Sequence, residues 1–259
     1  MELGLAGKTA IVGGASQGIG FAIARLLAME GCDVAMVARR KERLKEAVAQ
    51  IAAESGRRIL AIAADIRRAA DCERIVEDAA NALGGIDILV NNDGAPPLGD
   101  LAEFDDAAWT KAVEQNLMSV VRLTRRAIPH MKLRGGGRIV NITALSVLQP
   151  RPRFGLSIAT WAGVVGYAKT LSLEVAADGI TVNTLCPGRI LTGRLATVFN
   201  AGAAPDPKLL EAMAQEIPMR RIGTPEEIAG LVAFLASSYA GYVTGTTIPV
   251  DGGRFAGLL

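Results

Sequence analysis

Short runs of β-branched and other apolar residues alternate with longer helical patterns along the chain. The expected strands are 9–12, 34–37, 59–63, 86–90, 138–142, 181–185 and 247–250. Helical patterns separate them, for example at 19–30 and 42–54. Neighbouring parallel strands need a crossover of about a dozen residues, usually a helix, and that crossover is right-handed. The alternation therefore predicts an α/β fold with a parallel sheet and helices on both of its faces.

Composition narrows the class of protein. Half of the 259 residues are hydrophobic but only 4% are aromatic, so we expect an aliphatic core. Acidic and basic residues are interspersed and the net charge is +2, which indicates neither nucleic acid nor a membrane surface as a partner. No repeat, low-complexity segment or linker interrupts the chain, which predicts a single domain over 1–259.

The cysteines and the hydropathy pattern give expectations about the cellular compartment of the protein. Cys32, Cys72 and Cys186 are far apart and lack metal-binding or redox spacing, so we expect reduced thiols in a cytoplasmic protein and no metal site. The first residues show no signal-peptide pattern. The uncharged stretch 228–250 is long enough to cross a bilayer, but Ser, Gly and Pro residues interrupt it. It therefore favours a buried helix, a turn and a strand.

A glycine-rich turn follows the first expected strand and opens the first expected helix. Its sequence is Gly14-Ala15-Ser16-Gln17-Gly18-Ile19-Gly20. Glycines let the backbone turn tightly and approach a pyrophosphate, and a helix N-terminus offers unpaired N–H groups with a partial positive charge. The position between strand and helix favours a dinucleotide site. The alternative is a tight turn that binds no ligand.

The end of the second expected strand discriminates between cofactors. An NAD site usually carries an acidic residue there, which accepts hydrogen bonds from the ribose 2′-hydroxyl. This chain has Arg39 and Arg40 instead, and a guanidinium group suits a 2′-phosphate. We therefore expect NADP(H) to be favoured over NAD(H). The alternative is a solvated flank of the next helix, particularly for Arg40.

Further motifs follow the expected strands in order. They are Asp65-Ile66, Asn91-Asn92-Asp93-Gly94, Asn116, Pro187-Gly188 through Thr192, Val243-Thr244-Gly245 and Val250-Asp251-Gly252-Gly253. Together with the glycine spacing, they resemble the short-chain dehydrogenase/reductase family over nearly the whole chain, in particular the 3-oxoacyl-(acyl-carrier-protein) reductases and related carbonyl reductases. The resemblance implies a Rossmann-type doubly wound sheet of about seven strands, and a homodimer or homotetramer.

The resemblance also implies roles for these motifs. The position of Asp65 contacts adenine, the Asn-Asn segment supports the sheet and the cofactor, the Pro-Gly loop meets the nicotinamide amide, and Thr192 meets phosphate. The expected cofactor contacts beyond the glycine turn and the two arginines are therefore Asp65, Ile66, Asn92, Gly94, Pro187, Gly188, Ile190 and Thr192.

Catalysis in the family uses a serine after the fifth strand, and a tyrosine followed four residues later by a lysine on one helix face. Alignment of the flanking strands without a gap places Ala144, Ser157 and Trp161 at these positions. Asn116 matches the fourth catalytic residue. A shifted alignment does not restore the pair, because Lys169 follows Tyr167 at two residues and not at four.

Other groups offer replacement chemistry, and we consider Asn116, Ser146 and Ser157 the catalytic candidates. Ser157 can donate a hydrogen bond, although a serine is a far weaker acid than a tyrosine. Ser146 is two residues past Ala144 and either presents a hydroxyl near the same place or caps a loop. Asp93 replaces the usual family alanine beside the cofactor cleft, as a new acid/base group or as a solvated loop acid.

Arginines flank the expected substrate side. Arg151 and Arg153 lie between the fifth strand and the altered helix, and Arg189 and Arg194 flank the Pro-Gly loop. They favour an anionic small-molecule or acyl-carrier substrate, or else they are ordinary solvated charges.

Three functions remain open from the sequence. The first is an NADP(H)-dependent oxidoreductase with an altered active site, acting on a small or acyl carbonyl compound. The second is a non-catalytic cofactor-binding scaffold or regulatory homologue. The third is non-redox chemistry on the same fold, because a fold does not fix a function.

Overall fold

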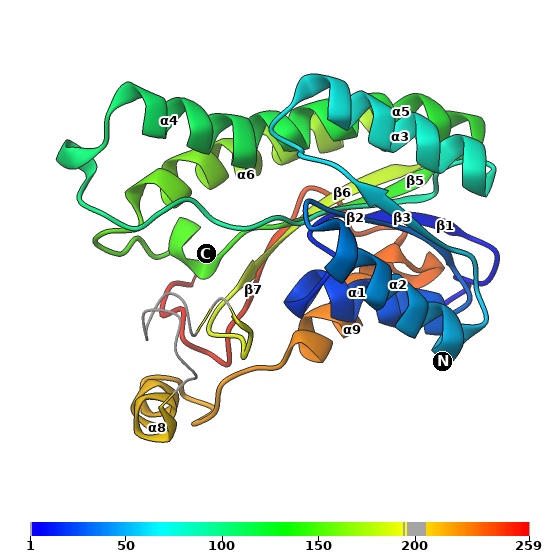
Figure 1. Cartoon of the computed structure of the whole chain (residues 1–259). Helices are drawn as coiled ribbons and strands as arrows, with labels where there is room; N and C mark the ends of the chain where they lie inside the picture. Colours follow the sequence, from blue (N-terminus) through cyan, green and yellow to red (C-terminus); the bar gives the residue numbers. More distant parts are fainter. Residues whose placement is uncertain (1, 194, 196–205, 259) are drawn as a thin grey trace.

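A sheet of seven parallel strands forms the centre of the molecule, in the order β3-β2-β1-β4-β5-β6-β7 (Figure 1). The computed structural model describes residues 2–193, 195 and 206–258. The strands are β1 Thr9–Val12, β2 Asp33–Ala38, β3 Ile59–Ala63, β4 Ile88–Asn91, β5 Gly137–Ile142, β6 Ile180–Pro187 and β7 Thr247–Val250. The predicted Rossmann-like α/β architecture is confirmed.

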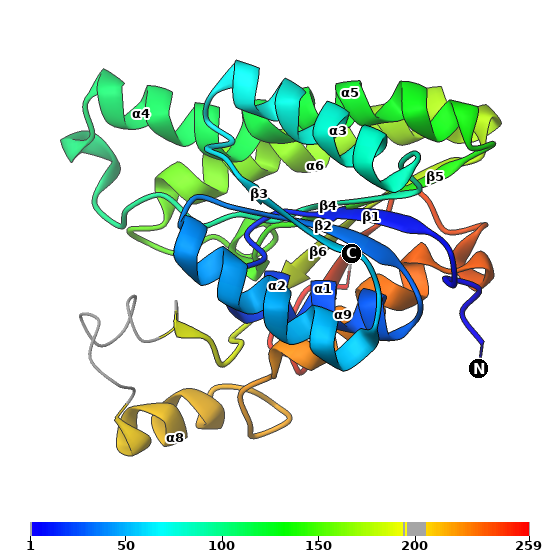
Figure 2. The ribbon, with the colours of Figure 1, turned by 45° about the vertical axis from the view of Figure 1, so that its right-hand side comes forward.

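Helices cover both faces of this sheet. They are α1 Gly18–Met29, α2 Lys41–Ser55, α3 Ala69–Leu83, α4 Asp106–Val113, α5 Ser119–Leu133, α6 Gly155–Val175, α8 Pro207–Gln215 and α9 Pro225–Ala236. Helices α1, α2 and α9 lie on one face, and α3, α5 and α6 on the other (Figures 1 and 2). Helix α8 stands apart from the sheet, at the lower left of Figure 1. No helix within the described residues is both long and apolar enough to cross a membrane.

Two aliphatic clusters form the core, one on each face. Ala10 and Val12 of β1 pack with α1 and α9, whereas Ile11 between them packs with α3 and α5. Alternate residues of a strand point to opposite faces, so a strand covered by helices on both faces needs apolar residues at every position. This explains why the sequence shows continuous apolar runs and not an alternation of apolar and polar residues.

The predicted elements agree with the structure except at their ends. The strand expected at 86–90 begins at Ile88, and the strand expected at 181–185 extends over Ile180–Pro187 because Pro187 still pairs with Val250 of β7. The uncharged stretch near the C-terminus contains most of α9, a short turn of 3-10 helix and β7, as expected.

The order of strands reverses between β1 and β4. Ala10 pairs with Ile88 and Val12 with Val90, while the chain leaves the two strands toward opposite faces of the sheet. A crevice opens beyond the carboxyl ends of the strands at such a point, and open α/β sheets bind their ligands there.

Candidate active site

The glycine turn occupies this crevice. Gly14 has a φ of 58°, in the left-handed region that favours glycine. A Cβ added at Gly20 would lie 2.4 Å from the carbonyl oxygen of Gly14, so the turn and the helix are closer than any side chain allows. Helix α1 starts at Gly18 without a side-chain cap and without an acid in its first turn. Its N–H groups are therefore available to an anion, and the turn fits a pyrophosphate.

The segment after β4 completes the wall of the crevice. Nδ2 of Asn92 donates a hydrogen bond of 3.0 Å to the carbonyl oxygen of Gly13. Nε2 of Gln115 donates one of 2.9 Å to the carbonyl oxygen of Gly94. Both ends of this segment are thus tied to neighbouring elements, which fixes its distance from the glycine turn.

The loop after β6 reaches the same turn. A Cβ added at Gly18 would lie 3.4 Å from Cγ2 of Thr192, so the threonine stands against the start of α1. Ile190 bridges to Gly223, and the N–H of Gly188 donates to the carbonyl oxygen of Val250 at 2.9 Å. These contacts hold the Pro187–Thr192 loop, and Thr192 lies at the start of α1 beside the crevice.

The ends of β2 and β3 form the other side. Arg39 and Arg40 are exposed just after β2. Beyond β3, Nε of Arg67 donates to Oδ1 of Asp65 at 2.8 Å, and hydrogen bonding from Arg67 holds the pKa of Asp65 below its ordinary value. The expected adenine contact therefore has its carboxylate engaged by a neighbouring side chain. Ile66 lines the crevice directly.

A cleft of about 520 Å³, part of it open to solvent, runs from Val37 and Ile66 to helix α6. Asn91, Asn116, Asn141, Thr143 and Trp161 line its other end.

Asn116 lies in a π-helical turn, Glu114–Met118, between α4 and α5. Its Nδ2 donates to Oγ1 of Thr160 on α6 at 2.9 Å, and its Oδ1 has no hydrogen-bond partner among the described residues. π-Helical turns are frequent at functional sites. Asn116 therefore presents an acceptor beside Trp161.

The candidate serines are buried near this end of the fold. Ser146 lies in a short 3-10 turn after Ala144, and Ser157 lies in the first turn of α6. Neither Oγ atom has a hydrogen-bond partner within the part of the chain that the structure describes. A buried hydroxyl without a partner is costly. Neither serine is among the residues that line the cleft, so the structure does not bring these two candidates into it.

Asp93, the acid that follows the two asparagines after β4, is partly exposed. It lines the cleft, and burial raises the pKa of its carboxyl group. Arg39, Asp65 and Arg67 act on it electrostatically, and all three follow β2 or β3. Asp93 lines the same cleft as Val37 at the end of β2 and Ile66 after β3.

The four expected substrate arginines are not equivalent. Arg189 is buried, and it donates to the carbonyl oxygen of Met213 on α8 at 2.7 Å and to Glu216 at 2.6 Å. It holds α8 and is not a free clamp. Arg151 stacks over the ring of Phe154. Arg153 is exposed, and Arg194 lies outside the described residues.

A parallel sheet with a glycine turn and a helix N-terminus at its switch point defines the Rossmann-like nucleotide-binding class of α/β proteins. Residues 14–254 match the family model described as "Enoyl-(Acyl carrier protein) reductase". The chain belongs to the short-chain dehydrogenase/reductase family, a family of oxidoreductases.

Several relatives span almost the whole chain. Dehydrogenase/reductase SDR family member 4 of Oryctolagus cuniculus is 38% identical over 96% of this chain and 94% of its own. Nodulation protein G of Rhizobium sp. (strain N33) is 40% identical over 96% of this chain and 97% of its own. The crystal structure of L-sorbose reductase from Gluconobacter frateurii complexed with NADPH and L-sorbose superposes with a TM-score of 0.93, at 37% identity and full coverage of both chains.

Sequence reasoning missed the residues that hold the site together. Gln115 anchors Gly94, Thr160 anchors Asn116, and Arg67 engages Asp65. Gln115 was the easiest to find, because it directly precedes the Asn116 motif. Thr160 had no such signal, because its partner is distant in the sequence.

Within the described residues, no group of three or more His, Cys, Asp or Glu side chains is arranged to hold a metal ion. Tyr167 packs against the core cluster beneath α6, and burial raises the pKa of its phenol group. This matches its interpretation as a core aromatic residue.

Proposed function

We propose that this protein is an NADP(H)-binding oxidoreductase with an atypical active site, acting on a small or acyl carbonyl compound or the corresponding alcohol. The observation that carries the proposal is the glycine turn at the β1–β4 switch point, with Arg39 beyond the neighbouring strand. An arginine there suits a 2′-phosphate better than a bare ribose hydroxyl. The likeness to L-sorbose reductase complexed with NADPH, and to YwfH, titled an NADPH dependent reductase, supports the same cofactor.

Hydride chemistry would come from the nicotinamide of the bound cofactor. The protein would position the carbonyl group and deliver a proton to its oxygen. In the expected family arrangement a tyrosine and a lysine do this, whereas here Ser157 and Trp161 take those positions and Ala144 takes that of the serine. The buried hydroxyls of Ser146 and Ser157 are the donors nearest in type to the missing groups.

Proton delivery should therefore be the weak step. A positioned general acid contributes about 10²–10⁴-fold to rate, and a serine hydroxyl is too weak an acid to supply that at neutral pH. Asn116, with its free acceptor Oδ1, can hold a water molecule that donates instead. We expect cofactor binding with slow turnover of ordinary ketone and 3-oxoacyl substrates.

Trp161 also favours a second candidate, a cofactor-binding protein without catalysis. Its indole lines the cleft where an ammonium group would otherwise assist the proton donor. Such a protein would act as a scaffold or as a regulatory homologue. Non-redox chemistry on the same fold is the third alternative, because the hydroxyls remain while the usual acid is absent.

Tryptophan fluorescence separates these functions. The chain has two tryptophans, so Trp109→Phe leaves Trp161 as the reporter inside the cleft. We expect NADPH to quench this emission saturably, and purified protein to reduce 3-oxoacyl and ketone substrates slowly. Binding without any turnover would favour the scaffold. An absence of binding would contradict the proposal, and turnover at tens per second would contradict the atypical site.

A further inference from the structure

Asp93 is the one ionisable side chain among the described residues that line the cleft. Its place is fixed from both sides, because Asn92 is bonded to Gly13 and Gly94 accepts a hydrogen bond from Gln115. The carboxyl group therefore belongs to the wall of the cleft and does not swing with a free loop.

The charges around Asp93 come from two neighbouring strand ends. Asp65 and Arg67 follow β3, and Arg39 follows β2. Arg67 is already committed to Asp65, with Nε at 2.8 Å from Oδ1 and 3.1 Å from Oδ2. Arg39, in contrast, forms no ion pair with any described residue. Of the two cations, Arg39 is thus the one whose charge is available to compensate Asp93.

Opposing effects act on the ionisation of Asp93, and burial, the largest of them, leaves the pKa of its carboxyl group above the ordinary value. Burial raises the pKa of this carboxyl group, and the charge of Asp65 raises it further. A hydrogen bond from the N–H of Gly94 and the charges of Arg39 and Arg67 lower it. Any ligand that neutralises Arg39 removes one of the positive charges that favour the ionised carboxylate.

A 2′-phosphate is such a ligand. It would pair with Arg39 and would itself bring about two negative charges to this side of the cleft. Both effects disfavour a carboxylate at Asp93. A ribose with a free 2′-hydroxyl brings neither effect.

We propose that Asp93 is a second cofactor-specificity residue, which takes up a proton from solvent when a nucleotide with a 2′-phosphate binds. This rests on the proposed NADP(H) binding. Protonation removes the repulsion between the carboxylate and the phosphate. The affinity for NADPH therefore falls as pH rises through the interval between the pKa values of Asp93 in the free and bound protein. The affinity for NADH changes less over the same interval.

Calorimetry tests this without any measurement of activity. NADPH and NADH are titrated at several pH values in two buffers with different ionisation enthalpies, which gives the number of protons taken up. The 2′-phosphate titrates near pH 6 itself, so wild-type protein alone cannot separate the two groups. Asp93→Asn retains the phosphate titration and removes that of the carboxyl group.

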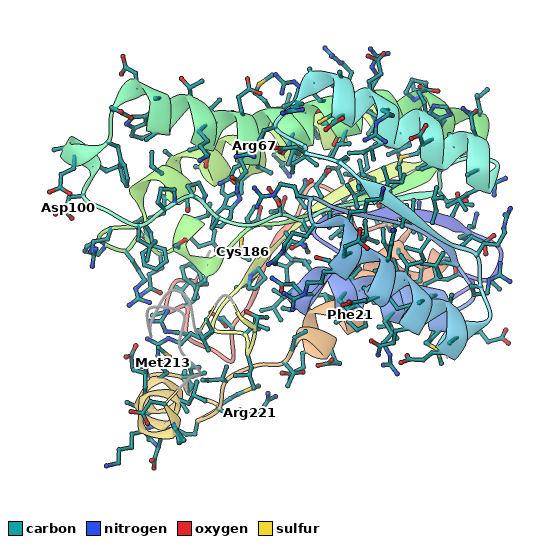
Figure 3. The ribbon with its side chains drawn as sticks, in the orientation of Figure 1. Phe21, Arg67, Asp100, Cys186, Met213 and Arg221 are labelled. Carbon is teal, nitrogen blue, oxygen red and sulfur yellow. The ribbon has the colours of Figure 1, made fainter. Side chains whose placement is uncertain are left out.

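The expected result has two parts. Asp93→Asn should lose the carboxyl share of the proton uptake with NADPH, and its ratio of NADPH to NADH affinity at pH 8 should rise about tenfold. Asp93→Ala is a second test, in case the asparagine disturbs the segment between Asn92 and Gly94, and it should show the same two changes. Asp100→Asn is the matched control in the same connection, since Asp100 is exposed at the far end of the segment (Figure 3).

Wild-type proton uptake and an unchanged affinity ratio in both Asp93 variants would overturn the inference. If the wild-type protein binds neither nucleotide, the proposed function itself fails. If the wild-type protein binds both nucleotides and the two Asp93 variants do not differ from it, the proposed function stands and the specificity role of Asp93 is wrong.

Discussion

Nδ2 of Asn116 donates a hydrogen bond of 2.9 Å to Oγ1 of Thr160, and thereby ties the π-helical turn to helix α6. The Thr160 hydroxyl in turn donates to the carbonyl oxygen of Leu156 at 2.8 Å. Ser157 and Trp161 stand on the same stretch of helix. This side-chain pair therefore links Asn116 directly to the stretch of α6 that carries the other candidate catalytic groups.

Thr160→Val should show how much the hydrogen bond between Asn116 and Thr160 stabilises the fold. The substitution leaves the buried Nδ2 of Asn116 without its acceptor, and we expect a loss of about 1–3 kcal/mol in the free energy of unfolding. Denaturant unfolding measures it, and the NADPH-dependent quench of Trp161 reports on the cleft. Thr160→Ser keeps the hydroxyl and is the control. Equal stability of the valine and serine variants would contradict the role of the hydrogen bond.

Arg39→Ala should remove most of the preference for NADPH over NADH. A hydrogen bond to a charged group contributes about 1.5–3 kcal/mol, which corresponds to a change of about 10–150-fold in the affinity ratio. Arg40→Ala, one residue further on, should change the ratio less. Calorimetry with both cofactors gives the ratios. A larger effect from Arg40 would exchange the roles of the two arginines.

Rebuilding the expected family set tests the atypical site. Ala144→Ser, Ser157→Tyr and Trp161→Lys together should raise turnover by about 10²–10⁴-fold, the share of a positioned general acid. Steady-state rates with ketone and 3-oxoacyl substrates measure the gain. The same triple variant with Phe at 157 lacks the acidic hydroxyl and is the control. Unchanged turnover with cofactor binding intact would mean that the substrate pocket serves another reaction.

Asp87 should make stability sensitive to acid. Burial opposes its ionisation, but hydrogen bonds from Arg134, the N–H of Thr9 and Lys8 outweigh burial and hold its pKa below the ordinary value. Its stabilising effect is therefore present above the pKa of the unfolded chain, about 3.9, and is lost as pH falls through the lower folded pKa.

Asp87→Asn should cost about 2–3 kcal/mol at pH 7, because hydrogen bonds between charged groups are lost, and much less near pH 2. Denaturant unfolding across pH measures this. Asp78→Asn breaks an exposed pair with Arg74 and should change stability by less than about 0.5 kcal/mol. A cost that does not shrink in acid would show that ionisation of Asp87 is not its source.

Self-association stays a prediction. Leu173 on α6 is 73% exposed, on the long helix that we expect to meet a second copy. Light scattering should show a dimer or tetramer at micromolar concentration, and Leu173→Glu should shift it toward the monomer. Met29→Glu, at the end of α1 on the other face, should not. A monomeric wild-type protein would refute the prediction.

The fold could be predicted from the sequence because its signals are local. The central strands, such as β1 and β4, are buried along their whole length and so appear as continuous apolar runs, and longer helical patterns separate them along the chain. The cofactor turn carries its signal within Gly14–Gly20, where the backbone leaves no room for a Cβ at Gly20.

The details of the site could not be predicted, because they depend on distant partners. In the sequence, Asp93 resembles an ordinary loop acid, because the residues whose charges act on it, Arg39 and Asp65, are distant along the chain. In the sequence, Arg189 resembles a solvated cation, whereas in the structure it donates a hydrogen bond to Glu216, which follows α8. Sequence spacing gives no information on contacts that form only after the chain has crossed the sheet.

The pairing of Ala10 with Ile88 also sets an order of events during synthesis. A chain growing from its N-terminus completes the glycine turn long before β4 has been made, so β1 waits with one unpaired edge. Contacts this far apart in sequence form slowly, and unpaired strand edges promote aggregation. Asn92, which bonds to Gly13 beside the glycine turn, is made only with β4, so the wall of the crevice is complete only after that interval.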